Sequence, residues 1–118
     1  MTDLIACLSS GKGTWEHIKQ LIEKENWENV FLVTDNFGKD NFKTSKQVNF
    51  ILVNNLDPIN IYIDKIISQL QKKIKGIEVA LNLVSGSGKE HMGIISAILK
   101  LGFAVRLVAL TKDGVKEI

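Results

Sequence analysis

The sequence predicts an α/β fold of the Rossmann-like, doubly wound class, with a mostly parallel five-stranded sheet in the order 3-2-1-4-5. Short apolar runs recur along the chain as continuous stretches, which is typical of strands buried on both faces of a parallel sheet. Segments with apolar residues at helical spacing separate most of these runs. Right-handed crossovers between parallel strands then place helices on both faces of the sheet.

The first half of the chain contains three of the expected strands. Leu4 to Leu8 is the first, and a helix is expected over Thr14 to Glu25. Val30 to Thr34 is the second strand, and Phe50 to Val53 is the third. The polar stretch between them, DNFGKDNFK from position 35 to 43, is predicted to be a loop, long enough to cover a neighbouring crevice.

The second helix is predicted from its start signal and its apolar face. Asp57 is placed as the N-cap, and Pro58 at the first helical position, where its missing N–H costs nothing. Isoleucines and Leu70 recur on one face. Gly76 is expected to end the helix.

Two strands and a helix complete the predicted fold. The fourth strand spans Ile77 to Val84, the third helix Glu90 to Leu101, and the fifth strand Phe103 to Leu110. Gly102 is expected to close the third helix. Because this helix is apolar on nearly all sides, we expect it to be buried on more than one side, the second against another subunit. Arg106 is expected at an exposed or edge position, or in an ion pair across a dimer.

Length and composition limit the class of protein. With 118 residues, the chain is expected to form one domain over positions 1–118. Cys7 is the only cysteine, which excludes an internal disulfide and favours a cytoplasmic location. No apolar run reaches the ~20 residues that a membrane span needs, so no membrane partner is expected. The net charge of +2 does not suggest direct DNA binding.

Two similar turns are the main candidates for function. One follows the first strand and the other follows the fourth, so both leave strand carboxyl ends at the point where the strand order reverses. Glycines allow close approach of a ligand, helix N-termini and lysines attract anions, and serines add hydroxyls. We therefore predict a phosphate-binding site. Its candidate ligand-binding residues are Ser9, Ser10, Gly11, Lys12, Gly13, Ser85, Gly86, Ser87, Gly88 and Lys89.

A nucleotide- or dinucleotide-binding protein of the ordinary Rossmann type is an alternative. A dinucleotide fingerprint beginning at Gly11 continues with Gly13 but has Glu16 in place of the third glycine. Asp35 ends the second strand, where a ribose-binding acid would lie. Both turns also depart from a Walker A loop, which needs a glycine where Leu83 or Ala6 stands.

The stretch Asn82-Leu-Val-Ser-Gly-Ser-Gly-Lys89 resembles a loop of the CARF family, the CRISPR-associated Rossmann-fold domains. In that family a strand ends in a stretch like Asp/Asn-x-x-Thr/Ser-Gly-Gly-Thr-Lys, and a helix follows. Asn82, Ser85, Gly86 and Lys89 match this pattern, whereas Ser87 and Gly88 replace its Gly-Thr pair. The family's other site loop follows the first strand and is small and polar, as the stretch from Ser9 to Gly11 is here. The resemblance adds Asn82 to the ligand-binding candidates.

The resemblance implies a homodimer that binds a cyclic oligoadenylate, a second messenger of type III CRISPR defence. Two copies of each turn would supply four lysines and four helix N-termini to one two-fold symmetric ring. Most members are fused to an effector, and only Thr111 to Ile118 remain here after the fifth predicted strand. The chain is therefore expected to act alone, to work with a separate effector, or to be one domain of a longer protein.

Some members of the family cleave the ring, so a ring nuclease is a second possibility. A ribose 2′-hydroxyl would attack the adjacent phosphodiester without a metal. Lys89 would stabilise the developing charge, and Ser9 or Ser10 would orient the ribose, which makes Lys89 and Ser10 the catalytic candidates. His91 lies near the predicted pocket and is a candidate base and ligand contact. No His, Cys and Asp residues have the spacing of zinc ligands, so no metal is expected. No cofactor is expected either.

Overall fold

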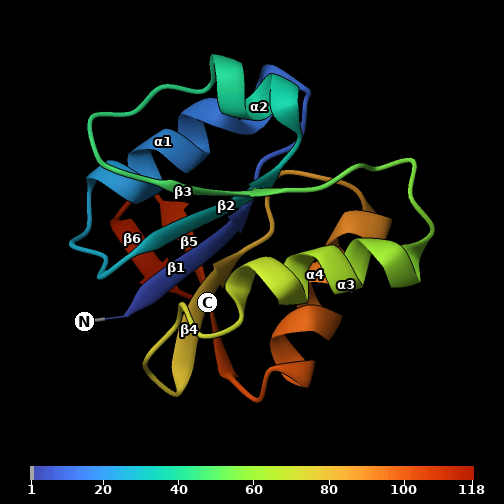
Figure 1. Cartoon of the computed structure of the whole chain (residues 1–118). Coiled ribbons are helices and arrows are strands. Elements are labelled where there is room, and N and C mark those ends of the chain that lie inside the picture. Colours follow the sequence, from blue (N-terminus) through green and yellow to red (C-terminus); the bar gives the residue numbers. More distant parts are fainter. Residues whose placement is uncertain (1) are drawn as a thin grey trace.

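The computed structural model describes residues 2–118 as a six-stranded sheet covered by helices on both faces (Figure 1). The sheet has the order β3-β2-β1-β4-β5-β6. The predicted α/β class and the order 3-2-1-4-5 are therefore confirmed, with one more strand than expected. The strands are β1 (Asp3–Cys7), β2 (Val30–Thr34), β3 (Asn49–Leu52), β4 (Glu78–Asn82), β5 (Ala104–Thr111) and β6 (Gly114–Glu117).

Parallel pairing joins the first five strands. Ile5 of β1 lies opposite Phe31 of β2 on one side and Leu81 of β4 on the other. Every residue of β1 and β2 is buried, which explains why these segments are continuously apolar except at Asp3 and Thr34. The centre of the sheet therefore forms where the sequence is least polar.

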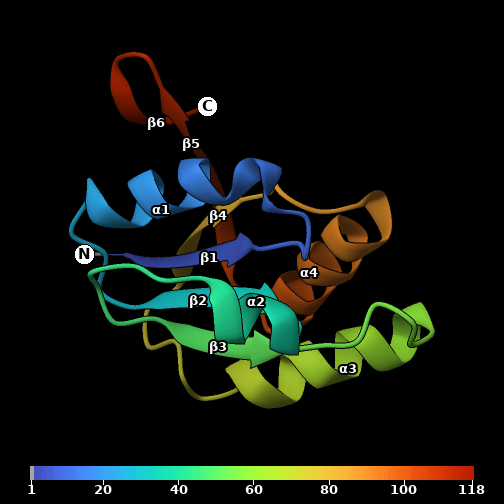
Figure 2. The same ribbon diagram turned by 90° about the horizontal axis from the view of Figure 1, so that it is seen from above.

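The sixth strand corrects the prediction of five. β6 pairs antiparallel with β5 as a hairpin, with Thr111 opposite Gly114. Gly114 has a φ of +104°, which suits the tight connection. In Figure 2 this hairpin projects beyond α1. β6 carries one large apolar residue, Val115, so its sequence gave little signal of a strand.

Arg106 lies on β5, and its charged partners are within the chain. Its Nε is 3.4 Å from Glu78 Oε1 on β4, and its Nη1 is 3.7 Å from Glu117 Oε1 on β6. These ion pairs join neighbouring strands of one sheet, whereas the ion pair considered from the sequence was one across a dimer. All three side chains are partly exposed, so the contribution to stability is small.

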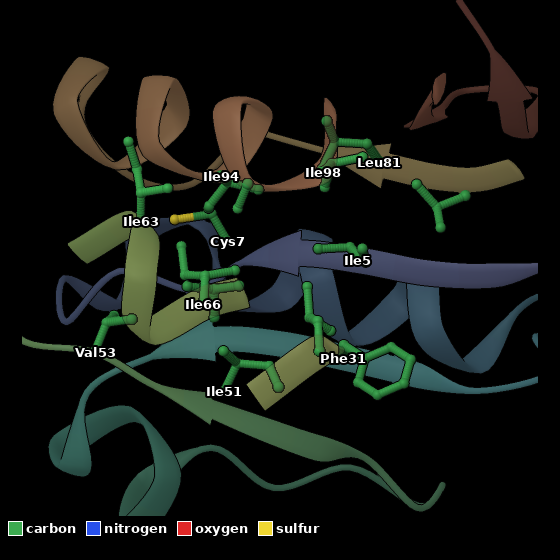
Figure 3. Close-up of a cluster of buried hydrophobic side chains, with 14 of the residues drawn as sticks. Ile5, Cys7, Phe31, Ile51, Val53, Ile63, Ile66, Leu81, Ile94 and Ile98 are labelled. Carbon is green, nitrogen blue, oxygen red and sulfur yellow. The ribbon is translucent and has the colours of Figure 1, made fainter. Parts of the chain in front are cut away.

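Four α-helices form the two outer layers. α1 and α2 cover one face of the sheet, and α3 and α4 cover the other (Figures 1 and 2). Figure 3 shows the core under α3 and α4, where Cys7 lies among Ile63, Ile94 and other apolar side chains. The helices are α1 (Trp15–Glu23), α2 (Asn36–Asn41), α3 (Ile59–Leu70) and α4 (Gly88–Lys100).

The segment predicted to be a polar loop at positions 35–43 contains α2 instead. Asp35 caps this short helix, its Oδ1 accepting a hydrogen bond from the Gly38 backbone N–H at 2.9 Å. Gly38 packs so closely on β2 that a Cβ there would lie 1.9 Å from Thr34 Oγ1. The prediction was wrong because the intrinsic helix propensity of this stretch is low. The helix forms because Asp35 caps it and Gly38 packs closely on β2.

The predicted ends of α3 were also wrong. Pro58, not Asp57, is the N-cap, and no side chain caps the helix. The Asp57 carboxylate pairs with Lys65 Nζ. The helix ends at Leu70, before Gly76, and Lys72 adopts a positive φ of 67° in the turn that follows. By contrast, Gly102 follows α4 with a φ of +88°, as predicted for a glycine that ends a helix.

α4 has one apolar face against the core and another on the surface. Ile94 and Ile98 are buried, whereas Met92 and Leu99 are 65% and 60% exposed. The helix is thus buried on one side in this chain, and the expected second side is open. Within residues 2–118, no helix is both long and apolar enough to cross a membrane.

Gly93 marks the closest approach of α3 and α4. A Cβ at this position would lie 2.5 Å from Cδ1 of the fully buried Tyr62 ring. We expect Gly93→Ala to lower the free energy of unfolding by about 1–2 kcal/mol, because overpacking outweighs the helix propensity gained. Denaturant unfolding measures this, with Ser96→Ala on the same helix as the control. An unchanged or raised stability in Gly93→Ala would contradict such close packing.

Candidate functional site

The two predicted turns meet at the carboxyl ends of β1 and β4. The Ser9 backbone N–H donates to Ser85 Oγ at 2.9 Å, and Ser85 Oγ donates to Ser9 Oγ at 3.2 Å. Ser85 is 1% exposed, so these bonds lie under the surface where a ligand would sit. Because the strand order reverses between β1 and β4, this is the crevice in which doubly wound sheets bind ligands.

The first turn is fixed by an aromatic side chain. Trp15 Nε1 donates to the Ser9 carbonyl oxygen at 2.8 Å. Residues Lys12–Thr14 then form a single turn of 3₁₀ helix before α1. Lys12 Nζ lies 5.7 Å from the centre of the Trp15 ring, a cation–π distance. Ser10, Gly11, Lys12 and Gly13 are exposed and available to a ligand.

The second turn is held by a capping box. Ser87 Oγ accepts from the Glu90 backbone N–H, and Glu90 Oε1 accepts from the Ser87 N–H at 2.8 Å. Gly86 has a φ of +112°, and Gly88 is the first residue of α4. The first amide groups of α4 have no partner within the helix and carry the positive end of its dipole. This end of α4 therefore favours an anion.

A buried carboxylate lies under the second turn. Glu90 is almost fully buried, and its Oε2 accepts a weak hydrogen bond from Cys7 Sγ at 3.8 Å. Burial, the nearby Glu90 charge and this hydrogen bond raise the pKa of the Cys7 thiol far above its usual range. Cys7 is thus an inert thiol of the core, and Glu90 holds the loop from below.

Lys89 bridges the site to the loop between β3 and α3. Its Nζ donates to the backbone carbonyl oxygens of Asn55, at 2.8 Å, and Asp57. A lysine ammonium has three donors, so one remains for a ligand. Lys89 thereby ties the start of α4 to the loop that carries Asn55.

Asn82 and the two histidines lie beside the loops in supporting positions. The buried Asn82 amide donates to the Val108 carbonyl at 2.8 Å, and its Oδ1 accepts from the Val84 N–H at 3.2 Å. His91 Nε2 lies 2.8 Å from the Ser85 carbonyl oxygen and donates to it. Asn82 and His91 therefore order the second turn from inside.

His17 is expected to make the stability of the protein depend on pH. Its Nε2 lies 3.3 Å from Asn82 Nδ2 and accepts the hydrogen bond, which requires the neutral ring. Burial lowers the pKa of His17 below 6.5. Below pH 6.5 the unfolded chain takes up this proton more readily than the folded one, so stability falls as the pH decreases.

We expect the free energy of unfolding to fall between pH 7.5 and 5.5, and His17→Gln to reduce the fall. Urea denaturation at several pH values, with wild type and variant in parallel, measures the difference. Equal pH dependence in the two proteins would show that His17 does not contribute.

Trp15, Glu90 and the β3–α3 loop hold the two turns in place, and none of them was predicted to belong to the site. Glu90 had a readable signal, because Ser87-x-x-Glu90 is a capping box pattern. The Lys89 contacts depend on the distance between two loops and have no local pattern.

Asp35, the candidate ribose-binding acid, gives little support to the alternative of a dinucleotide-binding protein. Its Oδ1 caps α2, as described above, and the carboxylate lies partly buried at the end of β2. In the part of the chain that the structure describes, no three or more His, Cys, Asp or Glu side chains gather in an arrangement suited to a metal ion. Other cavities lie at the amino ends of the strands, for example one lined by Asp3, Glu28 and Lys73.

Comparisons with known proteins do not identify this site. No family model matches the chain, and no curated protein sequence matches it significantly.

Proposed function

We propose that the chain is a CARF-like module that binds a cyclic oligoadenylate as a homodimer, with the ring over the carboxyl ends of β1 and β4. The observation that carries this proposal is the pair of hydrogen bonds between Ser9 and Ser85. These bonds join two glycine-rich turns, each followed by a helix, into one surface. A ligand with several phosphates suits such a surface better than a ligand with one.

Phosphate binding is supported by the charges and dipoles at this surface. Lys12 is exposed at one turn, and Lys89 keeps one free donor at the other. The N-terminus of α4 adds unpaired amide groups. Glu90 brings one opposing charge nearby, but its two oxygens already accept from Ser87 and Cys7 below the loop. The lysines and the dipole therefore dominate at the exposed side.

The dimer is supported by an apolar patch that reaches from α4 to β5. Val105 and Leu107 pair with Val79 and Leu81 of the core under α4, so they face the same side of the sheet as α4. All members of the α4/β5 patch are at least about one-third exposed: Met92, Ile95, Leu99, Val105 and Leu107. Exposed apolar side chains grouped on one face are typical of an interaction site.

The position of the α4/β5 patch suits a symmetric pair. α4 begins at the candidate site and runs away from it, so a two-fold axis along its exposed face would place both copies of the loops at the same end. A cyclic oligonucleotide of even length has the same two-fold symmetry. A second copy of this chain is therefore the partner we propose for the patch.

Calorimetric titration with cyclic tetra- and hexa-adenylate tests the proposal. We expect binding of one ring, weakened about 10²- to 10⁴-fold in Lys89→Ala, because each lysine–phosphate hydrogen bond contributes about 1.5–3 kcal/mol and occurs twice. Lys75→Ala, which removes an exposed lysine at the amino ends of the strands, should bind like wild type. No binding of either ring would refute the proposed ligand.

The same samples distinguish a sensor from a ring nuclease. Linear products after hours of incubation would show that the protein cleaves the ring, with Lys89 and Ser10 as the residues to substitute first. Intact rings would leave it a binding module whose effector is another protein or segment. Chromatography of the nucleotides gives this answer directly.

A further inference from the structure

A groove of about 410 Å³ lies beside the two turns, between the start of α2 and the β3–α3 loop. This volume is within the ~300–1,000 Å³ range of small-molecule sites. Its apolar lining residues are Phe37, which is 45% exposed, Leu56, which is 91% exposed, and the buried Val53. A partly exposed aromatic ring with aliphatic side chains in the same groove offers apolar surface on which a flat ring can stack.

Two carboxamides complete the lining of this groove. Asn36 and Asn55 are exposed, and within residues 2–118 neither side chain forms a hydrogen bond that would occupy it. Asn54, by contrast, accepts from the Leu56 N–H at 2.9 Å. A free carboxamide has one donor side and one acceptor side, which match N7 and the N6 amino group of adenine. The groove therefore combines a stacking wall with groups that recognise adenine.

The groove is connected to the candidate phosphate site on two sides. Lys89 donates to the Asn55 carbonyl oxygen and so fixes the loop that carries Asn55 and Leu56. On the other side, the Phe37 and Trp15 rings are 6.1 Å apart, and Trp15 donates to Ser9. Lys12 Nζ lies 5.6 Å from the Phe37 ring. A phosphate at the two turns and a base in the groove would thus belong to one nucleotide.

We propose that this groove is an adenine-binding subsite in which Phe37 and Leu56 hold the base and Asn36 or Asn55 recognises its N6/N7 edge. The proposal rests on the proposed function for the ligand class, a phosphate-linked adenylate. It adds the residues that determine base specificity. Each protomer supplies one such subsite, so a ring would place at least two of its bases in equivalent grooves.

Nuclear magnetic resonance of the labelled protein titrated with adenosine 5′-monophosphate tests the subsite. We expect the side-chain amide signals of Asn36 and Asn55 to shift. Inosine 5′-monophosphate, which has an oxygen in place of the N6 amino group, should bind about fivefold more weakly or worse. Phe37→Ala and the double variant Asn36→Ala/Asn55→Ala should each weaken binding of the adenylate to a similar extent. Asn60→Ala, an exposed asparagine on α3, is the matched control.

The ring titration and the mononucleotide titration separate the two proposals. If the ring binds but the Asn36 and Asn55 signals stay unchanged and the groove variants bind normally, the subsite is refuted and the proposed function stands. If the mononucleotide shifts these signals but no ring binds, the subsite stands and the cyclic ligand is refuted. If neither ligand has an effect, both proposals are wrong.

Discussion

Replacing Leu99 with glutamate is expected to give a monomer that no longer binds the ring. Leu99 is 60% exposed on α4 and belongs to the α4/β5 patch. In a dimer the substitution would bury a carboxylate against the apolar side chains of a second copy, a penalty of several kcal/mol for each protomer. Sedimentation equilibrium measures the oligomeric state, and calorimetry measures ring binding in the same sample.

The control for this substitution is Ile61→Glu. Ile61 is a similarly exposed aliphatic residue on α3, on the same side of the sheet but outside the α4/β5 patch. The Ile61→Glu variant should remain a dimer and bind the ring like wild type. If Leu99→Glu stays dimeric, or if wild type is already a monomer at the concentrations of the binding assay, the proposed interface is wrong.

Gly86→Ala is expected to lower the free energy of unfolding by about 2–5 kcal/mol. The φ of +112° disfavours any side chain by about 1–3 kcal/mol. In addition, the new Cβ would lie 2.6 Å from Cys7 Sγ and 3.3 Å from Glu90 Oε1, so the second turn would have to move. Thermal and denaturant unfolding measure the loss, which is large for a domain of this size.

Gly88→Ala is a matched control two residues away. A Cβ at Gly88 meets no atom within 4 Å, and Gly88 is the first residue of α4, where alanine is acceptable. Its stability should equal or slightly exceed that of wild type. Equal losses in the two variants would show that the turn does not depend on the left-handed conformation at Gly86.

The central part of the fold was predictable because burial on both faces leaves an unbroken apolar signal. β1, β2 and β4 show this signal, and the right-handed crossover rule limits the possible strand orders to a few, which include the observed one. α2 and β6 were not predictable, because each depends on contacts with β2 or β5 and has little apolar periodicity of its own. The ends of α3 were predicted wrongly. Pro58 and Gly76 favour a helix that begins at Pro58 and continues up to Gly76, but the helix begins at Ile59 and ends at Leu70.

The candidate site was predictable in position but not in its internal contacts. The sequence placed both turns at the carboxyl ends of adjacent strands, and the bonds between Ser9 and Ser85 confirm that they meet. Lys89 holds the β3–α3 loop because the folded chain brings its ammonium group close to the Asn55 carbonyl oxygen, and no local sequence pattern indicates this contact. The burial of Asn82 among internal partners likewise depends on where β5 passes.

The stoichiometry of the complex shows whether two chains share one cyclic oligoadenylate. Native mass spectrometry of the purified protein, mixed in turn with cyclic tetra-adenylate and cyclic hexa-adenylate, counts chains and rings in each assembly. We expect two chains with one ring of one of the two sizes, because both copies of each turn would face a single ligand. One chain carrying its own ring, or two chains that bind neither ring, would contradict it.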